Sequence, residues 1–600
     1  MGRGGKLSSG CATPFTQSHM GDNNAQRFWG LALVFSLLAM PVRAFDLSPT
    51  HAPDDVYYVA TDGVDNIPGG TSADPWATIT YALDNVPDDS LILVRPGTYT
   101  GRVRLRGTFA QGVTVRSEVP YQARLRNDGT VVTCFYGQGI TLEGFDIAHS
   151  GAGAGALVIQ IQDLISGPEQ VGRITLRNNI LHDSYNNDIL KVNNNATDVL
   201  IEGNMFYNQS GSDEHIDVNS VTDVVIQDNV FFNDMLGSAP SDTSSFVVIK
   251  DSNEGSDDQW GSEHITVRRN VFFNWIGSSG QGFVRAGEDG MAYYEARDVL
   301  IENNLMIGNG VQKIRSPFQM MNVYSVTVQA NTVVGNMPAL EFGARIFTYG
   351  SGAPANDQIR LHNNIWADPT GTMGDTFNRG NNTANLTFDN NLFWNAGNSF
   401  PTSSESIIEV SDDANRVVGD PLLGDQAGLV TPRWDAGSGQ FADGSSTIRE
   451  AFERLVMLYG TPALGSPAVD VADPAYAPVE DILGNPRVDP DIGAVEFVPS
   501  LVLRGTPGNQ TIYLTWEVNA SLPVTATWRI TAYSQTVGSV LVATDPLSAT
   551  RAYTLSDLTN GIWYTVTLNS MAGPMPILTD TVTVMPTDKF VYLPLVLRED

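Results

Sequence analysis

A short phrase recurs along the middle of the chain: an alternating apolar strand that ends in Asn followed by two further apolar residues. It reads Ile-Thr-Leu-Arg-Asn-Asn-Ile-Leu at its first occurrence and Ile-Thr-Val-Arg-Arg-Asn-Val-Phe at its fourth. The basic interval is about 25 residues and is stretched where loops are inserted. This self-similarity predicts a solenoid. The asparagines that mark the repeat are Asn179, Asn204, Asn229, Asn270, Asn304, Asn331, Asn364 and Asn391.

The content of each repeat indicates which solenoid it is. Runs in which Val, Ile and Thr alternate with polar residues recur without helical periodicity between them, so each repeat consists of strands. Strand-only repeats stack as a parallel β-helix, with the apolar side chains of all coils facing one core. The recurring Asn is expected to sit in a turn and to hydrogen-bond the Asn one coil above. The predicted fold is all-β: a right-handed parallel β-helix followed by a small β-sandwich.

The composition fits a folded, secreted protein and excludes several kinds of partner. Apolar residues make up 42% and charged residues 17% of the 600 positions. The formal net charge of −32 argues against nucleic acid and against an anionic membrane surface. No Walker loop, Rossmann fingerprint, HExxH motif or GxSxG elbow occurs in a fitting context, so no nucleotide is expected. We expect a monomer.

Residues 1–44 are predicted to be a secretory signal. The apolar run at 28–40 is short for a membrane span, and small residues ending at Ala44 suit a signal peptidase. Secretion is therefore expected, with attachment to the cell surface and an uncleaved anchor as alternatives. The polar stretch before the run is long, so Met20 is a candidate start beside Met1.

The two cysteines do not predict a disulfide in the secreted chain. Cys11 lies before the expected cleavage point, which leaves Cys134 alone. Cys134 stands in Val-Val-Thr-Cys-Phe-Tyr, with no base nearby in the sequence, and is predicted to be a small core residue.

Residues 45–90 are expected to cap the solenoid. The stretch Val-Tyr-Tyr-Val-Ala-Thr-Asp-Gly from Val56 and the turn Pro-Gly-Thr-Tyr from Pro96 resemble the opening segment of many secreted right-handed β-helix proteins. In those proteins a strand, a short helix and this turn close the N-terminal end. A cap is physically required, because the first coil would otherwise expose its edge and its core. Coils are then predicted over residues 91–410.

The pattern changes after residue 410. Gly-Asp-Pro-Leu-Leu from Gly419 and Asp-Ile-Gly-Ala-Val-Glu from Asp491 lie within residues 411–498, which resemble the choice-of-anchor Q segment of bacterial surface β-helices. An amphipathic helix is predicted over 447–459. Its apolar face would consist of Ile448, Phe452, Leu455 and Val456.

Residues 499–600 resemble a fibronectin type III sandwich with a short tail. Alternating strands are separated by turn-rich loops, Trp516 fits the core tryptophan of the second strand, and Leu558 and Tyr564 match the late-strand pattern. The final Tyr-Leu-Pro-Leu-Val-Leu-Arg, which begins at Tyr592, is expected to be an edge strand.

Equivalent residues of successive coils lie about 4.8 Å apart in a parallel β-helix, so the repeat predicts contacts. Counting back from the Asn phrase aligns residues 188–193, 214–219, 247–252 and 282–287. Alternation then sends one set of side chains into the core, namely Leu190, Ile216, Ile249 and Val284. It turns a charged column outward, namely Lys191, Asp217, Lys250 and Arg285. The insertions after Asn229 and Asn270 would emerge beside these coils.

Two interpretations of this column remain open. In the first, Asp217 neutralises Lys191 and Lys250 in a salt ladder. In the second, the residues of the column catalyse cleavage of a uronic-acid polymer by β-elimination. This reaction requires that the sugar carboxylate is neutralised, that the neighbouring proton is removed and that the leaving oxygen is protonated. Lys250 beside Arg285 is then the base, because a neighbouring cation lowers the pKa of a lysine. His215 is the alternative base or the acid.

Carboxylates beside the column predict a calcium site. Asp217 and Glu214, with Asp188 in reach, offer hard oxygen ligands without cysteine, which favours calcium over zinc. Substrate-binding roles fall to Lys191, Asn193 and Asn219. The acidic turn Gly-Glu-Asp-Gly, from Gly287 to Gly290, either joins the metal site or simply makes a turn.

The stretch Asn-Asp-Ile-Leu-Lys, the stretch Asp-Glu-His-Ile-Asp-Val-Asn and the turn at Gly287 together resemble pectate-lyase-like secreted β-helix proteins. The alginate lyase and chondroitinase B group is similar in order: acidic calcium ligands, then a Lys, then an Arg on successive coils. The resemblance implies that Glu214 and Asp217 bind metal, that Lys250 is the base and that Arg285 assists. The local phrases that surround the Lys and the Arg in that group are not reproduced here.

The sequence therefore predicts an exported lyase that cleaves an acidic polysaccharide with the help of Ca²⁺. One alternative is a glycoside hydrolase that uses paired carboxylates among Asp188, Glu214 and Asp217. The other is a non-catalytic, carbohydrate-binding or adhesive protein of the cell envelope.

Overall fold

The computed structural model describes residues 55–589 with internal gaps. The gaps are 165–169, 211–213, 234–244, 254, 258, 276–281, 310–314, 337–341, 375–377, 380–382, 403–407, 520–525, 535, 537–539, 546–549 and 572–575. The predicted signal at 1–44, the tail from Tyr592 and much of the insertions after Asn229 and Asn270 lie outside the described residues. Within the described ranges, no helix has both the length and the apolar character that a bilayer crossing requires.

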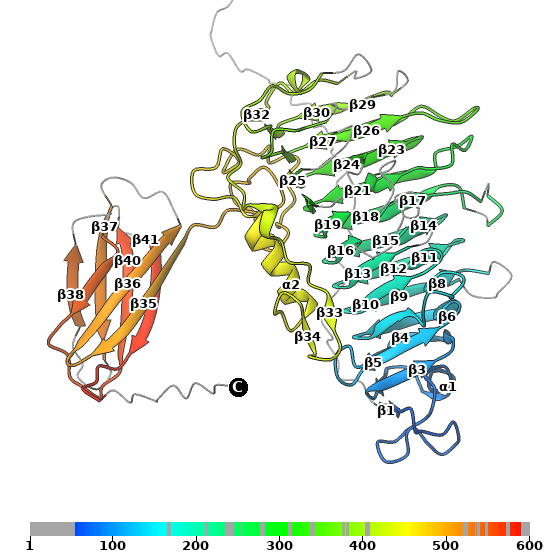
Figure 1. The fold of residues 1–600 in the computed structure, drawn as a ribbon, viewed down its shortest axis with the longest axis horizontal. Helices are drawn as coiled ribbons and strands as arrows, with labels where there is room; N and C mark the ends of the chain where they lie inside the picture. The colour runs from blue at the N-terminus through cyan, green and yellow to red at the C-terminus, as the bar shows by residue number, and fades with distance from the viewer. Residues whose placement is uncertain are drawn as a thin grey trace, which may run out of the picture. The chain divides into compact units, whose positions relative to one another are not determined.

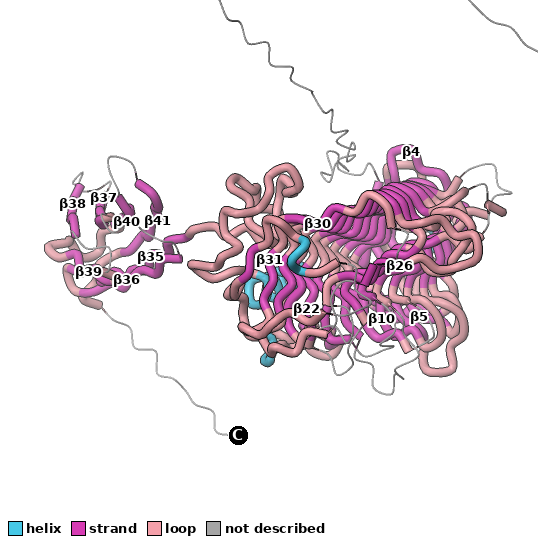
Figure 2. Tube along the Cα trace, turned by 90° about the horizontal axis from the view of Figure 1, so that it is seen from above, coloured by secondary structure: helices cyan, strands magenta, loops and turns pink. Residues whose placement is uncertain are grey.

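The body of the molecule is a right-handed parallel β-helix in which each coil contributes strands to parallel ladders (Figure 1). The first ladder begins with parts of β4 (Val103–Ser117) and β6 (Val132–Glu143). It continues through β8 (Ile159–Gln162), β11 (Leu190–Asn193), β14 (Ile216–Asn219), β17 (Val247–Lys250), β20 (Gly282–Ala286), β23 (Ser316–Met321), β26 (Ala344–Phe347) and β29 (Asn378–Arg379). Viewed from above in Figure 2, the strands of successive coils superimpose.

The second and third ladders complete each coil. The second runs through β1 (Asp55–Val59), β2 (Ser90–Val94), later parts of β4 and β6, β9 (Gly172–Arg177), β12 (Thr197–Glu202), β15 (Thr222–Gln227), β18 (Ser262–Arg268), β21 (Ala296–Glu302), β24 (Val323–Gln329), β27 (Asp357–His362) and β30 (Thr387–Asp389). The third runs through β3 (Gly97–Thr100), β5 (Ala123–Asn127), β7 (Asp146–His149), β10 (Ile180–Ser184), β13 (Met205–Gln209), β16 (Val230–Asn233), β19 (Val271–Trp275), β22 (Leu305–Gly308), β25 (Thr332–Gly335), β28 (Ile365–Ala367), β31 (Leu392–Trp394) and β32 (Val417–Val418).

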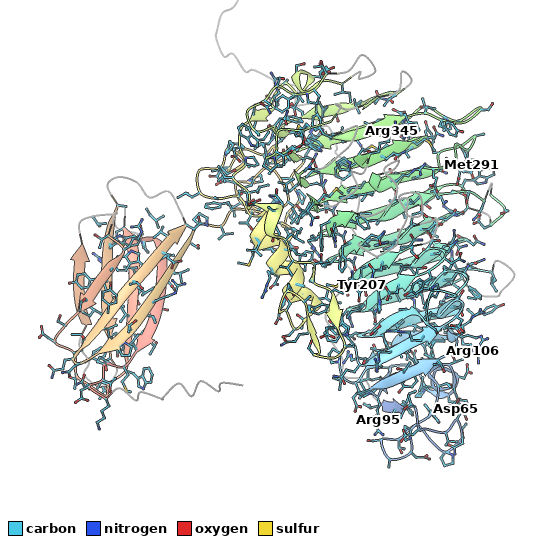
Figure 3. All side chains as sticks on the ribbon, in the orientation of Figure 1. Asp65, Arg95, Arg106, Tyr207, Met291 and Arg345 are labelled. Carbon is cyan, nitrogen blue, oxygen red and sulfur yellow. The ribbon has the colours of Figure 1, made fainter. Side chains whose placement is uncertain are left out.

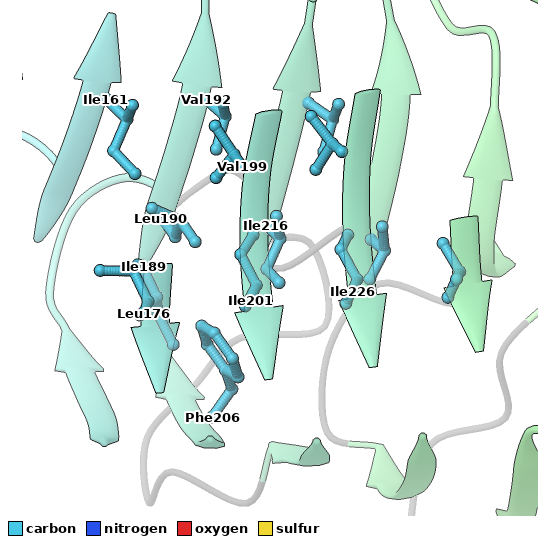
Figure 4. Close-up of a cluster of buried hydrophobic side chains, with 14 of the residues drawn as sticks. Ile161, Leu176, Ile189, Leu190, Val192, Val199, Ile201, Phe206, Ile216 and Ile226 are labelled. Atoms are coloured by element: carbon cyan, nitrogen blue, oxygen red, sulfur yellow. The ribbon is translucent and has the colours of Figure 1, made fainter. Parts of the chain in front are cut away.

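One continuous apolar core fills the space between the ladders. Side chains such as Leu190, Ile201, Phe206 and Ile216 point into it from different ladders (Figure 4). All four residues predicted to be buried in the aligned strands, including Ile249 and Val284, have no exposed surface. Cys134 is also fully buried, as predicted, and burial raises the pKa of its thiol to about 12.

The N-terminal end of the core is closed by α1 (Ile79–Asn85). Thr78 begins the helix, since its hydroxyl accepts a hydrogen bond from the Tyr81 N–H at 3.2 Å. Ile79 and Leu83 pack into the solenoid core, so α1 covers apolar surface that the first coil would otherwise expose.

The recurring Asn residues form the hydrogen-bonded ladder that the repeat predicts. The Asn179 side-chain amide donates to Asn204 Oδ1 at 3.1 Å, and the same bond repeats from coil to coil up to Asn391, which donates to Asp413. The residue before each Asn has a positive φ, as in Asn178 (55°) and Gly203 (64°). Each phrase thus specifies a turn with one left-handed residue, and the stacked Asn side chains hydrogen-bond the buried backbone groups inside that turn.

Replacing Asn270 with alanine should cost about 3 kcal/mol of unfolding free energy, because buried donors lose their acceptor. Asn270 Oδ1 accepts from the backbone N–H of Asn229 at 3.1 Å and from its side-chain amide at 3.0 Å. Chemical denaturation of the purified protein measures the change. Asn398→Ala, at an exposed position, is the control and should leave the midpoint unchanged. Equal midpoints for the two variants would contradict a structural role for the ladder.

After the last coil the chain returns along the outward side of the third ladder. This segment includes η1 (Val410–Asp412), η2 (Gln426–Gly428), β33 (Trp434–Asp435), β34 (Gln440–Phe441) and α2 (Ile448–Leu455), which continues as a π-helical turn, η3 (Val456–Gly460). The predicted amphipathic helix is therefore present, and its apolar face packs on outward residues of the ladder such as Val230, Val271 and Leu305. Figure 1 shows α2 alongside β10 and β13.

The C-terminal part is a small antiparallel β-sandwich. One sheet has the order β35 (Ser500–Gly508), β36 (Thr511–Asn519), β39 (Ala552–Leu555), and the other β38 (Val540–Asp545), β37 (Thr527–Tyr533), β40 (Tyr564–Met571), β41 (Pro576–Val584). Trp516 is buried in its core against Trp528, with ring centroids 5.5 Å apart, and Leu558 and Tyr564 are buried with them. The resemblances to fibronectin type III and to choice-of-anchor Q remain predictions from the sequence.

Candidate functional site

The register of the first ladder corrects part of the predicted column. Lys191 pairs with Asp217, as predicted. Between β14 and β17, however, Lys250 pairs with Asn219 and not with Asp217, a difference of two residues. Arg285 pairs with Val248, which itself pairs with Asp217, so Arg285 does belong to the column of Asp217. Because the difference is an even number, Lys250 keeps the outward orientation.

A cluster of three buried carboxylates lies at the start of this site. Oxygen atoms of Asp188, Glu214 and Asp217 lie within 4.8 Å of one another, and each residue is at most 3% exposed. The residues belong to two successive coils, Asp188 to one and Glu214 and Asp217 to the next, and the backbone N–H of Glu214 donates to Asp188 Oδ1 at 2.9 Å. The stacking of coils thus brings together the three residues that the sequence predicts to bind metal.

The chemistry of the cluster fits a divalent, oxygen-preferring cation. Lys191 forms an ion pair with Asp217, but one ammonium does not neutralise three carboxylates. Asp217 Oδ1 is buried without a hydrogen-bond partner among the described residues, which leaves a ligand atom available. Burial lowers the pKa of Lys191, but Asp217 and Asp188 outweigh burial and hold that pKa above its usual value. Calcium accepts such an all-oxygen donor set.

Two cations further along the ladder share one carboxylate. Glu288 forms ion pairs with Lys250 and with Arg285, the latter at 2.6 Å between Nη1 and Oε1. Asp289 lies 3.9 Å from Lys250 Nζ. Burial lowers the pKa of Lys250, yet Asp217 and Glu288 outweigh burial and raise it well above the ordinary value. The net shift of the Lys250 pKa is thus opposite to the lowering expected from a neighbouring cation, because the carboxylates dominate.

The turn that carries Glu288 is held by a second carboxylate. Glu295 is fully buried and accepts backbone N–H bonds from residues 288 to 291, at 2.8, 2.9, 2.6 and 3.2 Å. Gly287 has a φ of 78°, and a Cβ atom there would lie 1.7 Å from the Met321 carbonyl oxygen. The acidic turn is thus a fixed element that presents Glu288 to the two cations. Met291, in the same turn, lies at the edge of the β-helix away from α2 in Figure 3.

The amide side chains predicted to bind substrate stand in the column of Lys250. Asn193 pairs with Asn219 across β11 and β14, and Asn219 pairs with Lys250 across β14 and β17. Asn219 exchanges hydrogen bonds with Ser252, at 2.8 Å to its hydroxyl and 3.1 Å from its N–H. Asn193 Oδ1 is buried without a partner, although its amide donates to Asn194 at 3.0 Å.

The structure does not support a catalytic role for His215. The residue precedes β14, has no exposed surface and packs edge-on against Phe246, with ring centroids 4.8 Å apart. Neither ring nitrogen has a hydrogen-bond partner in the part of the chain that the structure describes, and burial lowers the pKa of His215 to about 3. The imidazole is thus a neutral member of the core.

Two features of the site escape sequence reasoning. Glu288 was assigned to a turn or to the metal, whereas it pairs with Lys250 and Arg285. Gln319, which follows Arg285 in its column, is 1% exposed, and neither atom of its amide group hydrogen-bonds to any described residue. The scarcity of lysine in the sequence also points to this site. The whole chain has only Lys6, Lys191, Lys250, Lys313 and Lys589, and two of them, Lys191 and Lys250, lie in the first ladder.

Comparisons with known proteins find partial similarities. No protein-family model matches the chain. A lacto-N-biosidase of Bifidobacterium longum subsp. longum is 31% identical over 170 residues, which is 28% of this chain and only 10% of that protein. Pectate lyase Pel9A is similar at a TM-score of 0.45 and 15% identity over 74% of this chain and 96% of its own. The alginate lyase AlyGC is similar at a TM-score of 0.30 and 17% identity, over 59% of this chain and 54% of its own.

Proposed function

We propose that this protein is an exported polysaccharide lyase that cleaves a uronic-acid polymer by calcium-assisted β-elimination. The observation that carries the proposal is one outward site on consecutive coils, where a buried carboxylate cluster stands beside Lys250 and Arg285. The local similarity to a protein named lacto-N-biosidase supports a carbohydrate as substrate class. Arg285 and the two lysines are the cations of the site, and a bound calcium ion would add the positive charge that an acidic polymer needs on a chain of net charge −32.

Each residue has a defined role in this mechanism. Arg285 binds the uronate carboxylate, which takes the place that Glu288 occupies in the free protein, and so acidifies the proton on the adjacent carbon. Lys250, once relieved of Glu288, removes that proton and then donates it to the leaving oxygen. Lys191, Asn193 and Asn219 hold neighbouring hydroxyl and carboxyl groups.

Asp188, Glu214 and Asp217 are the residues that would hold calcium. A bound calcium ion supplies positive charge that helps to neutralise the uronate carboxylate and offsets the effect of Asp217 on Lys250. Asp217 is one of the groups that raise the pKa of Lys250, so charge compensation at the cluster favours the neutral lysine that proton removal requires.

Glu288→Gln should shift the acid limb of the pH–rate profile to lower pH. Activity requires neutral Lys250, and Glu288 raises the pKa of Lys250, so loss of the Glu288 charge lowers that pKa and lets the neutral form appear at lower pH. The measurement is kcat/KM for unsaturated-end formation across pH. Glu263→Gln, which removes a carboxylate paired with Arg297, is the control and should leave the limb in place. An acid limb of the pH–rate profile that is unchanged in Glu288→Gln would contradict the assignment of Lys250 as base.

The test of the function is a panel assay. Polygalacturonate, alginate and chondroitin sulfate are incubated with the full chain, with and without a calcium chelator, and the products are analysed for the double bond that elimination creates. We expect unsaturated ends from at least one polymer and their loss on chelation. Shortened products without the double bond would overturn the lyase assignment, and intact polymers throughout would support a non-catalytic surface protein.

A glycoside hydrolase is the second candidate, and the pair Glu288 and Asp289 favours it. Burial raises the pKa of Glu288, but Arg285 and Lys250 outweigh burial and hold it below its usual value. Burial instead raises the pKa of Asp289. Neighbouring carboxyl groups with pKa values pushed apart are the arrangement that general acid and base roles need. The saturated products of a hydrolase distinguish this candidate.

A further inference from the structure

Large aromatic side chains gather at the turns that border the charged site. Among the described residues of the β-helix, the strongly exposed Trp and Tyr side chains are Tyr136, Trp260 and Tyr349. Trp260 is 52% exposed and lies in the turn after β17, the strand that ends at Lys250. Tyr349 is 63% exposed and lies in the turn after β26. All three residues lie at the edge where the first ladder passes into the second, and Trp260 and Tyr349 are the two on coils close to the Glu288 turn.

Trp260 is held in place in the turn between β17 and β18 while its ring stays in contact with solvent. Its indole packs edge-on against Tyr293, with ring centroids 4.9 Å apart, and the Tyr293 hydroxyl donates to the carbonyl of Asp251 at 3.1 Å. A Cβ atom on Gly255 would lie 2.4 Å from the indole, so glycine at that position allows the ring to lie against the turn. The indole thus packs against the turn at Gly255 and, at one edge, against Tyr293.

Tyr349 is held in the same way against the Glu288 turn. Its backbone N–H donates to Asn322 Oδ1 at 3.1 Å, and its carbonyl accepts from the Asn322 amide at 2.6 Å. A Cβ atom on Gly290 would lie 2.8 Å from the Tyr349 ring, which places the ring directly beside the turn. The strands place the Glu288 turn, after β20, between the turns that carry Trp260 and Tyr349.

Fixed, solvent-facing aromatic rings on both sides of a polar centre suit a sugar chain. One face of a pyranose ring carries C–H groups, which gain from contact with the electron-rich face of an aromatic ring, and the hydroxyl groups around its rim stay available for polar groups. Packing beneath each ring also means that little side-chain entropy is lost on binding.

We propose that Trp260 and Tyr349 are stacking subsites for the sugar units on either side of the unit bound by Lys250 and Arg285. The polymer then runs along the stack of coils, from the turn after β17 past the Glu288 turn to the turn after β26. This inference rests on the proposed function for the identity of the central unit. It adds two binding subsites and a direction for the chain.

The experiment measures binding apart from cleavage. All variants are made in the full chain carrying Lys250→Ala, which prevents turnover, and migration is measured in gels containing polygalacturonate, alginate or chondroitin sulfate. Trp260→Ala and Tyr349→Ala should each weaken binding about tenfold, and the double variant more than either. Tyr136→Ala and Trp563→Ala are matched controls, since both residues are exposed aromatics elsewhere in the chain, and should migrate like the parent. Melting temperatures confirm that each variant is folded.

The outcomes separate this inference from the proposed function. Weaker binding only in the Trp260 and Tyr349 variants supports the subsites, even if the panel assay with the natural sequence yields no unsaturated ends and so overturns the lyase. Unsaturated ends combined with unchanged binding by both variants support the lyase and overturn the subsites. Failure of every polymer to retard the parent protein also overturns the subsites.

Discussion

Lys250→Ala is expected to lower the rate of unsaturated-end formation by about 10²–10⁴-fold without changing the melting temperature. Lys250 is the group assigned to remove the proton, and no neighbouring described side chain duplicates it, because Lys191 is paired with Asp217 and His215 is buried in the core. The measurement is kcat and KM on the polymer that the panel assay identifies. We expect the loss in kcat, since the lysine acts on the bound substrate.

Lys250→Arg distinguishes a base from a positive charge. Arginine keeps a cation beside Glu288, but its guanidinium does not give up a proton in this pH range. We expect this variant to be nearly as inactive as Lys250→Ala. Substantial activity in Lys250→Arg would show that Lys250 acts only as a cation and that the base is another group.

Asp217→Asn is expected to abolish calcium binding and to lower activity at least about 100-fold. Asp217 contributes the buried carboxylate oxygen that has no hydrogen-bond partner, so its loss removes both a ligand and a charge. Isothermal titration with calcium measures binding directly, and the polymer assay measures activity. Retention of calcium affinity would place the ion elsewhere.

Lys191→Met provides the opposite change at the same cluster. The Lys191 ammonium pairs with Asp217 and competes with any cation for that carboxylate. Its removal should tighten calcium binding, while its replacement by Arg should not. If Lys191→Met weakens calcium binding, the lysine supports the cluster rather than competing with the ion.

The fold was predictable because one signal repeats. The Asn phrase specifies a left-handed turn, a buried amide and the start of an apolar strand, and each coil contains all three. An error in aligning one coil does not affect the next coil, because each Asn phrase fixes the alignment of its own coil. The predicted helix at Ile448 was accessible for a similar reason: its apolar spacing and its Thr447 cap are local features.

The site was predictable only where no loop intervenes. Between Asp188 and Asp217 the repeat is undisturbed, so the carboxylate cluster follows from counting residues. Between Asn229 and Lys250, and again after Lys250, the coil contains insertions, and counting back from Asn270 misplaces Lys250 by two residues. The sequence does not indicate how many inserted residues lie on each side of a strand.

His215 and Glu288 show a second limit. Alternation of buried and outward residues holds within a strand, but His215 precedes β14, where its side chain turns into the core beside Phe231 and Phe246. Glu288 reaches Lys250 because Glu295 gathers four backbone N–H groups into one turn. Such a contact depends on the path of the turn, which no periodic pattern describes.

The return segment after the last coil also limits where chemistry can take place. A three-walled prism offers a long polymer three faces, but this segment seals one of them by packing Phe452 and its neighbours onto Val230 and Val271. Under the proposed function, a substrate of many sugar units would bind along a face that this segment leaves open. The charged first ladder forms such a face, so the return segment would determine which face binds substrate in addition to stabilising the third ladder.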